Sequence, residues 1–341
     1  MYKLNEKIAS VLGFGFDSKG HCLYNERRKI INLKTKQIIY EHNQDFQELF
    51  FHEMFIVNDL YGKGIYIDST QNIVQTDFFI RYIQRNHLIY TKRINEERYT
   101  FFKNLSNDNY TLIKFSSLID LISNDFYIFF DSLSLNISLF SFPNAINIWN
   151  FNLSSLGTYQ NDINESHPFT VNKFVGIWNN LLLVQLNGYS LLALDVNTGE
   201  LVKHIPLKTT LDLPQGQYLI DEPNMHLVND SIIWLSNQHL IHIELNNWDI
   251  QTKAINHNLP REQEWRCFKN TYFDGLLYFV ADYGWQYVTP SWIGVMNAQT
   301  GEVLWKQQLE KTGGLPEAPQ VNEKNLYIRT AKGDLHIFER E

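Results

Sequence analysis

A strand–turn–strand unit recurs along this chain, and the repeat restricts the possible folds more than any other feature of the sequence. The copies span 29–40, 181–205, 240–251 and 293–309. In the last three copies the inter-strand turns centre near Thr198, Asn247 and Thr300, which are 49 and 53 residues apart. Periods of 20–50 residues are typical of repeat architectures, and a propeller blade takes about 40–50 residues. The spacing therefore predicts an array of similar blades.

Each repeat contains about four strands. The segment 181–205 reads as three apolar strands, separated by Asn187-Gly188 and by a turn at Thr198-Gly199. Asn-Gly supplies the positive φ that a tight hairpin turn needs. A further apolar strand precedes each hairpin, as at 231–235, 275–280 and 325–329. Four antiparallel strands make one propeller blade, so the pattern predicts an all-β chain.

Two copies of the turn carry a family resemblance. Residues 191–202 read LLALDVNTGELV and residues 293–306 read IGVMNAQTGEVLWK. Both resemble the repeat of the PQQ-like (quinoprotein-like) β-propellers, in which a strand ending in Ala-Leu-Asp runs into a Thr-Gly turn and a later Trp. The copy that ends at Trp305 is the strongest, and the likeness fades before about residue 170.

The predicted fold is a single β-propeller domain over residues 1–341, with seven blades preferred and six to eight possible. The predicted blades are 11–45, 46–85, 86–120, 121–165, 166–210, 211–255 and 256–310. The remaining C-terminal residues resemble part of one more blade, which Met1–Ser10 would complete by pairing the two termini and removing an open edge. Two stacked β-sandwiches are the alternative fold.

Charge is distributed unevenly along the chain. Residues 1–150 contain 16 Lys and Arg and 16 Asp and Glu, whereas residues 151–341 contain 13 and 21, which accounts for the net charge of −8. An acidic second half argues against binding to nucleic acid, which needs clustered Lys and Arg. It suits a basic partner, because opposite fields steer encounter. The alternative is that the acidic residues only keep the protein soluble.

The sequence predicts a cytoplasmic protein without membrane contact. The first ten residues have no apolar signal region, and no stretch approaches the roughly 18 uninterrupted apolar residues of a membrane span. Cys22 and Cys267 are the only cysteines, which excludes a disulfide-rich scaffold and a CxxC metal or redox motif.

Known catalytic, metal and cofactor motifs are missing. The family resemblance implies a quinone cofactor, but the chain has no adjacent cysteine pair and is shorter than the eight-bladed dehydrogenases, so no cofactor is predicted. His239 and His242 lie three apart in a predicted strand and face opposite sides, so they cannot easily share a metal ion. Cys22 follows His21, where a turn is favoured over a reactive Cys–His pair. There is no GxSxG nucleophile motif, and we predict no catalytic residue.

Three loops in the acidic half are candidates for partner binding, at 212–224, 262–266 and 282–292. They combine acidic residues with Trp and Tyr, the residue types that anchor protein interfaces. The candidate residues are Asp221, Glu222, Glu262, Glu264, Trp265, Asp282, Tyr283, Trp285, Tyr287 and Trp292. The alternative is that the aromatic residues pack between blades.

The predicted function is protein binding without catalysis, and the narrower hypothesis is an immunity protein that neutralises a basic toxin domain. Many toxins are nucleases with basic active-site faces, which an acidic surface would block. One alternative is a ligand-binding, hydrolytic or lyase propeller that uses a central channel. Another is a scaffold in a larger assembly.

Overall fold

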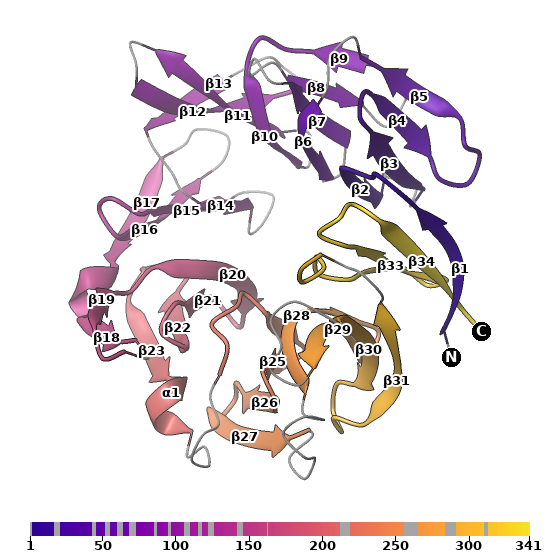
Figure 1. Ribbon diagram of the computed structural model, residues 1–341. Coiled ribbons are helices and arrows are strands. Elements are labelled where there is room, and N and C mark those ends of the chain that lie inside the picture. The colour runs from indigo at the N-terminus through magenta and orange to yellow at the C-terminus, as the bar shows by residue number, and fades with distance from the viewer. Residues whose placement is uncertain are drawn as a thin grey trace. The chain divides into compact units, whose positions relative to one another are not determined.

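The computed structural model shows an all-β chain, drawn in Figure 1. The structure describes residues 2–16, 21–42, 46–51, 55–59, 64–67, 73–84, 87–94, 97–105, 110–114, 118–121, 126–141, 146–161, 163–211, 219–255, 265–283, 291–309 and 313–341. They form two compact units. Unit 1 comprises Met1–Ile8 and Phe151–Glu341, and unit 2 comprises Ala9–Asn150. We describe each unit separately.

The sheets of unit 2 are four-stranded and antiparallel, and each is built from one continuous segment. The first contains β2 (Gly13–Phe16), β3 (Cys22–Glu26), β4 (Lys29–Asn32) and β5 (Ile38–Glu41). The second contains β6 (Phe46–Phe51), β7 (Phe55–Asp59), β8 (Gly64–Ile67) and β9 (Ile73–Gln75). The third contains β10 (Phe79–Gln84), β11 (His87–Ile94), β12 (Glu97–Asn104) and β13 (Tyr110–Lys114). The fourth contains β14 (Leu118–Leu121), β15 (Phe126–Asp131), β16 (Asn136–Ser141) and β17 (Asn147–Asn152).

The described residues of unit 1 contain three further continuous four-stranded sheets. The first contains β20 (Val171–Trp178), β21 (Leu181–Leu186), β22 (Ser190–Asp195) and β23 (Leu201–Pro206). The second contains β24 (Met225–Val228), β25 (Ser231–Ser236), β26 (His239–Glu244) and β27 (Asp249–Ala254). The third contains β28 (Trp265–Phe273), β29 (Leu276–Tyr283), β30 (Ser291–Asn297) and β31 (Val303–Leu309).

The last sheet of unit 1 joins the two termini, as predicted. It contains β32 (Gln320–Val321), β33 (Asn325–Arg329), β34 (Leu335–Arg340) and β1 (Tyr2–Ile8). Strand β1 pairs antiparallel with β34, from Tyr2 opposite Arg340 to Ile8 opposite Leu335. The Tyr2 hydroxyl also lies 3.0 Å from the Tyr278 hydroxyl in the preceding sheet, so the N-terminal strand is held on two sides.

These four-stranded antiparallel sheets are the blades of a β-propeller. Within the described residues, the continuous segments supply seven blades and the paired termini supply an eighth, at the upper end of the predicted six to eight. The predicted boundary at 85 is wrong, because β10 (Phe79–Gln84) begins the next blade rather than ending the previous one. The preceding blade ends on β9, a strand of only three residues, so the true period there is shorter than the one read from the second half.

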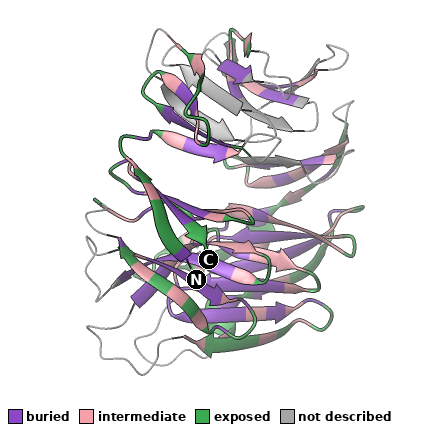
Figure 2. Cartoon of the chain, turned by 90° about the vertical axis from the view of Figure 1, so that its right-hand side faces the viewer, coloured by how far each residue is buried: buried purple, intermediate pink, exposed green. Residues whose placement is uncertain are grey.

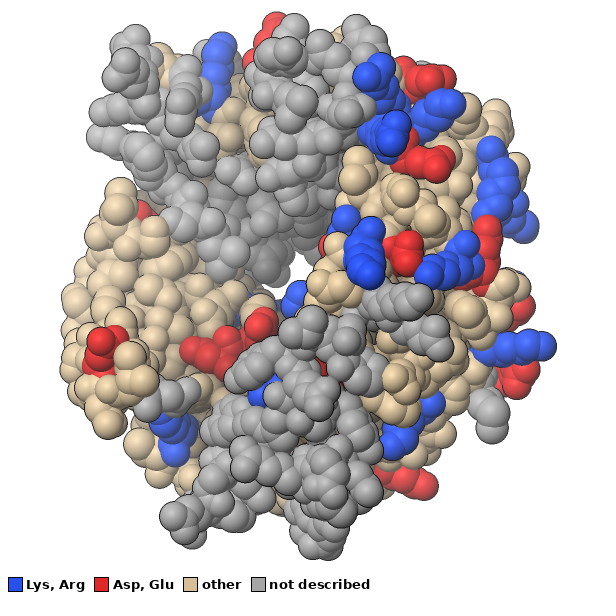
Figure 3. All heavy atoms as spheres, in the orientation of Figure 1, with Lys and Arg blue, Asp and Glu red and all other residues tan. Residues whose placement is uncertain are grey.

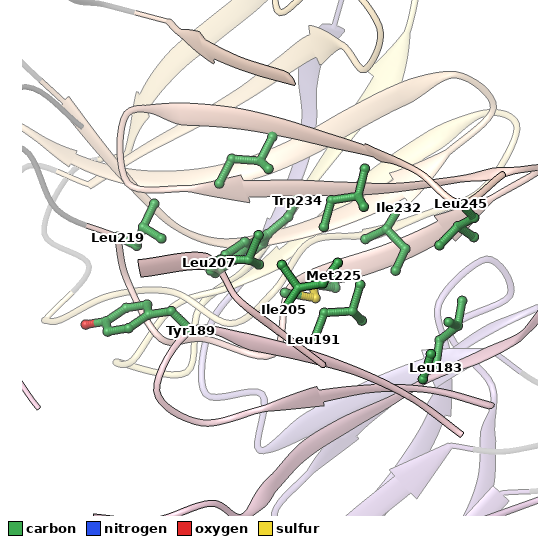
Figure 4. Close-up of a cluster of buried hydrophobic side chains, with 13 residues drawn as sticks. Leu183, Tyr189, Leu191, Ile205, Leu207, Leu219, Met225, Ile232, Trp234 and Leu245 are labelled. Carbon is green, nitrogen blue, oxygen red and sulfur yellow. The ribbon is translucent and has the colours of Figure 1, made fainter. Parts of the chain in front are cut away.

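Apolar side chains fill the space between neighbouring blades of unit 1. Leu183 and Leu191 from the β20–β23 blade pack with Ile232 and Trp234 from the β24–β27 blade, as Figure 4 shows. A second cluster fills the space between the β24–β27 and β28–β31 blades, and a third lies between the β28–β31 blade and the terminal one. A blade alone cannot bury both of its faces, so stacking of neighbours stabilises the array. Figure 2 shows the buried strands within the blades.

The repeated turn is stabilised by hydrogen bonds between its own residues. Asp195 ends β22, and its Oδ1 accepts bonds from the backbone N–H of Asn197 and Thr198 at 2.8 and 2.9 Å. Gly199 then adopts φ 73°, where glycine has no steric penalty. The equivalent positions are Asn297, Thr300 and Gly301 in the β28–β31 blade and Asn32, Thr35 and Lys36 in the β2–β5 blade.

Two short helical elements complete unit 1, namely η1 (Leu153–Leu156) and α1 (Leu207–Thr210). None of the helices in the described residues is long and apolar enough to cross a membrane.

Candidate partner-binding face

Strand direction places a defined set of connections at one end of the unit 1 blades. Because every pairing is antiparallel, the connection between the second and third strands of a blade lies at the same end as the connection to the next blade. In unit 1 these connections are 153–170, 187–189, 207–224, 237–238, 255–264, 284–290, 310–319 and 330–334. We call this end the loop face.

Contacts between blades confirm this placement. The carboxylate of Asp221, before β24, accepts a bond from the backbone N–H of Gly188 at 2.7 Å. The backbones of Asn237 and Cys267 exchange hydrogen bonds of 3.1 and 2.9 Å, which join the β25–β26 turn to the start of β28. Connections of neighbouring blades therefore meet at the loop face.

The described strands that flank the three loops predicted to bind a partner have those ends at this face. Residues 212–218, 256–264 and 284–290 lie outside the described residues. The candidates Glu262, Glu264, Trp285 and Tyr287 are among them, and the side chain of Tyr283 is not described either. Their role stays a prediction, but the strands that carry the loops are described, and they end together at the loop face.

Asp221 is a structural anchor at this face. One of its oxygens accepts from Asn172 Nδ2 at 3.0 Å and the other from the Gly188 backbone. Burial raises the pKa of the Asp221 carboxyl, and the hydrogen bonds from Gly188, Tyr189 and Asn172 oppose that rise. The side chain therefore fixes the turn 187–189 to the segment that leads into β24.

Glu222 lies beside Asp221 and is half-buried. Its backbone oxygen accepts from Gln185 Nε2 at 2.6 Å, and Gln185 Oε1 accepts from the Met225 N–H at 3.1 Å. These hydrogen bonds from the Gln185 side chain hold the backbone of residues 222–225 against β21. The backbone that carries the Glu222 carboxylate is therefore fixed.

Trp265 is buried, which favours the alternative that its ring packs between blades, and its contact with a partner stays a prediction. It is the first residue of β28, and its ring stacks on Phe279 at 5.1 Å between centroids and 9° between planes. Phe279 in turn lies over Gly294, where a Cβ would be 2.2 Å from the phenyl ring. The glycine leaves room for the aromatic pair in the core.

Asp282 is also buried, as half of an ion pair with Arg266 directly across the β28–β29 ladder. Arg266 Nε donates to Asp282 Oδ1 at 2.9 Å, and its Nη2 donates to Oδ2. Burial raises the pKa of the Asp282 carboxyl, and the bonds from Arg266 oppose that rise. The pair joins the two strand ends from which the segments 256–264 and 284–290 depart, so Asp282 has a structural role, and its contact with a partner stays a prediction.

Trp292 is half-buried in β30 and packs against the cluster that contains Trp265. Lys306 Nζ lies 5.3 Å from the centre of its ring, on the neighbouring strand β31. Part of the ring therefore serves the core, which is the alternative that the sequence left open.

Sequence reasoning missed a small hairpin on the loop face. Strands β18 (Thr158–Gln160) and β19 (Ser166–Pro168) form a two-stranded sheet within the connection from β17 to β20. Tyr159 covers Gly188, where a Cβ would lie 2.4 Å from its ring. At the tip, Asn161 Oδ1 accepts from the N–H of Ile163 and of Glu165 at 3.0 and 2.8 Å. The sequence signals for this turn include Asn161 at its first position and Asn164, which adopts φ 61°.

The two cysteines and the histidines of β26 lie in environments that suit a structural role. Cys22 is the first residue of β3 rather than part of a turn, and burial raises the pKa of its thiol to about 12. Cys267 is buried in the core, where its pKa is also raised by burial. His239 is buried and His242 half-buried in β26. Within the described residues no three His, Cys, Asp or Glu side chains gather as metal ligands.

Net charge differs between the units. Unit 1 contains 15 Lys and Arg and 22 Asp and Glu, for a net −7, whereas unit 2 contains 14 and 15, for a net −1. Charges of both signs are interspersed on the side of the molecule shown in Figure 3, with broad areas that carry neither. The net negative charge of unit 1 is therefore distributed over its whole sequence.

Comparison with known proteins supports the fold alone. No protein-family model and no curated protein matches the chain. Among solved structures, BamB from Moraxella catarrhalis is similar over 100% of both chains, with a TM-score of 0.60 and 10% identity. Saccharomyces cerevisiae Sqt1 is similar over 100% of this chain and 98% of its own, at TM-score 0.60 and 10% identity. The computationally designed protein Ika8 matches 97% of this chain and 96% of its own, at TM-score 0.61 and 10% identity.

The propeller fold is confirmed by these likenesses and by the four-stranded blades. The PQQ-like repeat is not, because no family model matches it, so that resemblance stays a prediction.

Proposed function

We propose that the chain is a non-catalytic protein-binding propeller that contacts its partner through the loop face of unit 1. The proposal is supported by the described strand ends that flank the predicted binding segments 212–224, 262–266 and 282–292, because these ends lie at the loop face. Binding residues concentrate on loops that a rigid scaffold positions. The packed blades of unit 1 supply such a scaffold.

The described contacts support a structural role for some candidates, and the proposal gives a binding role to others. Asp221 and the Arg266–Asp282 pair fix the strand ends that carry the loops, and a fixed base reduces the entropy lost on binding. In this proposal Trp285 and Tyr287 anchor the partner, because large aromatic side chains dominate interface energies.

The narrower proposal is that the partner is a basic toxin domain and that the chain is its immunity protein in the cytosol. Its support is the net charge of −7 in unit 1 and the acidic pair Glu262 and Glu264 in one of the three segments. An acidic surface accelerates association with a basic one and suppresses other partners, and salt weakens this effect.

Charge reversal at the loop face tests the binding proposal. The tagged full-length chain captures protein from a lysate of its own cells, and the double variant Glu262→Lys/Glu264→Lys is compared with it at low and at high salt. We expect the variant to lose at least about tenfold in capture of the salt-sensitive partner, because like charges then face each other.

The matched control is Glu200→Lys/Glu302→Lys, which reverses two exposed carboxylates at the opposite end of the unit 1 blades. This control has the same net charge as the test variant and should keep full capture. Equal loss in both variants would mean that bulk charge, not the loop face, governs binding. Capture of no protein by the original chain at low salt would contradict the proposal.

A growth assay tests the immunity proposal separately. The probe is a basic toxin domain encoded beside the gene of this chain, produced in cells with or without it. The chain should restore growth, the Glu262→Lys/Glu264→Lys variant should fail to do so, and the control variant should restore it. Absence of such a neighbouring gene, or absence of protection, would contradict the immunity function.

A further inference from the structure

Outer strands expose a row of backbone N–H and C=O groups that can pair with another chain. In each continuous blade this outer strand is the fourth one. Natural proteins protect such edges with charged side chains or by keeping them very short. Among the strands whose side chains are described, protection by charge comes from Glu41 in β5, Lys203 in β23, Asp249 and Lys253 in β27, and Lys306 in β31. Strand β9 has only three residues.

Strand β17 is the exception among these outer strands. It has six residues, Asn-Ile-Trp-Asn-Phe-Asn, with no charge, no proline and no glycine. Short segments with high β-propensity and no charge are the kind that pair edge to edge. The strand therefore lacks both forms of protection.

The side chains along β17 divide between the core and solvent. Trp149 is buried, whereas Ile148 is 44% exposed and Ile146, just before the strand, is 58% exposed. On the inner side, the Ser141 N–H donates to the Ile146 carbonyl at 2.9 Å and Ser138 Oγ to Asn150 Oδ1 at 2.6 Å. These bonds attach β17 to β16, and β17 is the end strand of its described sheet, with two exposed isoleucines beside that edge.

We infer that β17 is a self-association edge, which pairs antiparallel with β17 of a second copy of this chain. A two-fold axis through Ile148 would place the two Ile148 side chains opposite each other and Ile146 opposite Asn150 of the other copy. Such an interface is isologous and closes at two copies. This surface lies outside the loop face of unit 1, and the inference does not depend on the proposed function.

Charge selects a second copy as the occupant. Like charges directly opposite each other destabilise a strand pair. The longer outer strands other than β17 carry charged residues, so pairing of such a strand with the same strand of a second copy can bring like charges together. Unit 2, which contains residues 146–150, has a net charge of only −1, against −7 for unit 1. Two copies that approach through β17 therefore meet the weaker repulsion.

A site-specific cross-link tests the pairing. Both native cysteines are buried, so an introduced surface cysteine reports on contact between copies. Residues opposite each other in an antiparallel pair have Cα atoms about 4.5–5.5 Å apart, within disulfide range. We expect Ile148→Cys to form a covalent dimer under mild oxidation. Leu133→Cys, an 85% exposed position in the β15–β16 turn, should stay monomeric. Equal cross-linking of both variants would overturn the inference.

Sedimentation of the full chain provides a second measurement. We expect the average mass to rise from 40.2 kDa toward twice that value with concentration, with weak affinity because one strand pair buries little area. Ile148→Lys should weaken association about tenfold, whereas Leu133→Lys should leave it unchanged. Thermal melts of both variants check that each is folded. A chain that stays monomeric at every concentration, or an Ile148→Lys variant that associates as well as the original, overturns the inference.

Discussion

The buried pair Arg266–Asp282 shows at the scale of single residues why a residue type alone does not identify a binding site. In the sequence Asp282 is an acidic residue that opens an aromatic loop, which makes it a candidate for contact with a basic partner. The alternation of β29 places it opposite Arg266 instead, and both side chains are buried. A cross-strand partner 16 residues away is invisible to sequence pattern.

Loss of this pair should destabilise the protein strongly. We expect Asp282→Ala to lower the free energy of unfolding by about 3–5 kcal/mol, because it leaves a buried guanidinium without its counter-charge. Chemical denaturation measures the change. Glu317→Ala, which removes the exposed partner of Arg329, is the control and should cost at most about 1 kcal/mol.

A double variant separates the charge effect from packing. Arg266→Met/Asp282→Leu replaces the pair with apolar side chains, and we expect it to recover most of the lost stability. A double variant as unstable as Asp282→Ala would show that the site depends on shape rather than on the uncompensated charge.

At the scale of elements, the turn between the third and fourth strands is where sequence and structure agree best. An Asp or Asn, a Thr three residues later and then a residue with positive φ form the same hydrogen-bonded turn in three blades. In the third of them the position of positive φ is Lys36, at 56°, where the other two have Gly199 and Gly301.

Replacing Lys36 with glycine should therefore stabilise the turn. The left-handed conformation costs an L-residue about 1–2 kcal/mol, and the extra flexibility of unfolded glycine takes back about 0.5–1 kcal/mol. We expect Lys36→Gly to raise the free energy of unfolding by up to about 1 kcal/mol, measured by denaturant titration. Lys34→Gly is the control in the same turn, at a position without positive φ, and should be destabilising. A loss of stability in Lys36→Gly equal to that in Lys34→Gly would contradict the conformational argument.

The turn also explains how much of the fold was predictable. Wherever Asx and Thr-Gly chemistry marks the end of the third strand, as in 191–202 and 293–306, the strands and their order are as predicted. The boundary near β10 was misplaced because blades there contain strands as short as β9, without that turn signature. The hairpin β18–β19 was missed because it is held by contacts with Gly188 and Asn187 from the next blade, which no local pattern reveals.

The candidate site was predicted as a set of loops rather than residue by residue. Chain order alone places the three loops on one face, because antiparallel strands alternate in direction. Which side chains point outward depends on packing, and Trp265, the first residue of β28, has its ring stacked on Phe279. Aromatic residues next to a loop either bind a partner or pack between blades, and only the packing seen in the structure distinguishes the two roles.

At the scale of the whole molecule, buried histidines link stability to pH. Burial lowers the pKa of His204, His226, His239, His242 and His336, and for His226 to about 4. Their ordinary value is 6.5, so just below pH 6.5 the unfolded chain binds more protons than the folded one. Stability is therefore complete above pH 6.5 and falls progressively as the pH drops toward about 4 for His226. Burial raises the pKa of the Asp221 and Asp282 carboxyls above 3.8. Protonation of these two carboxyls therefore has the opposite effect and stabilises the folded chain as the pH falls toward 3.8.

His226 is the residue through which this dependence can be tested. Its Nε2 lies 2.8 Å from Asn270 Oδ1, and Lys173 adds to the burial that lowers its pKa. One such histidine contributes a slope of at most about 1.4 kcal/mol per pH unit. We expect the melting temperature of His226→Gln to depend less steeply on pH just below pH 6.5. The substitution removes a group that binds a proton in the unfolded chain but not in the folded one. The control is His167→Gln, whose side chain on the hairpin is 43% exposed, and it should keep the original slope. If both variants keep that slope, protonation of His226 does not contribute to acid destabilisation, and the remaining buried histidines must carry it.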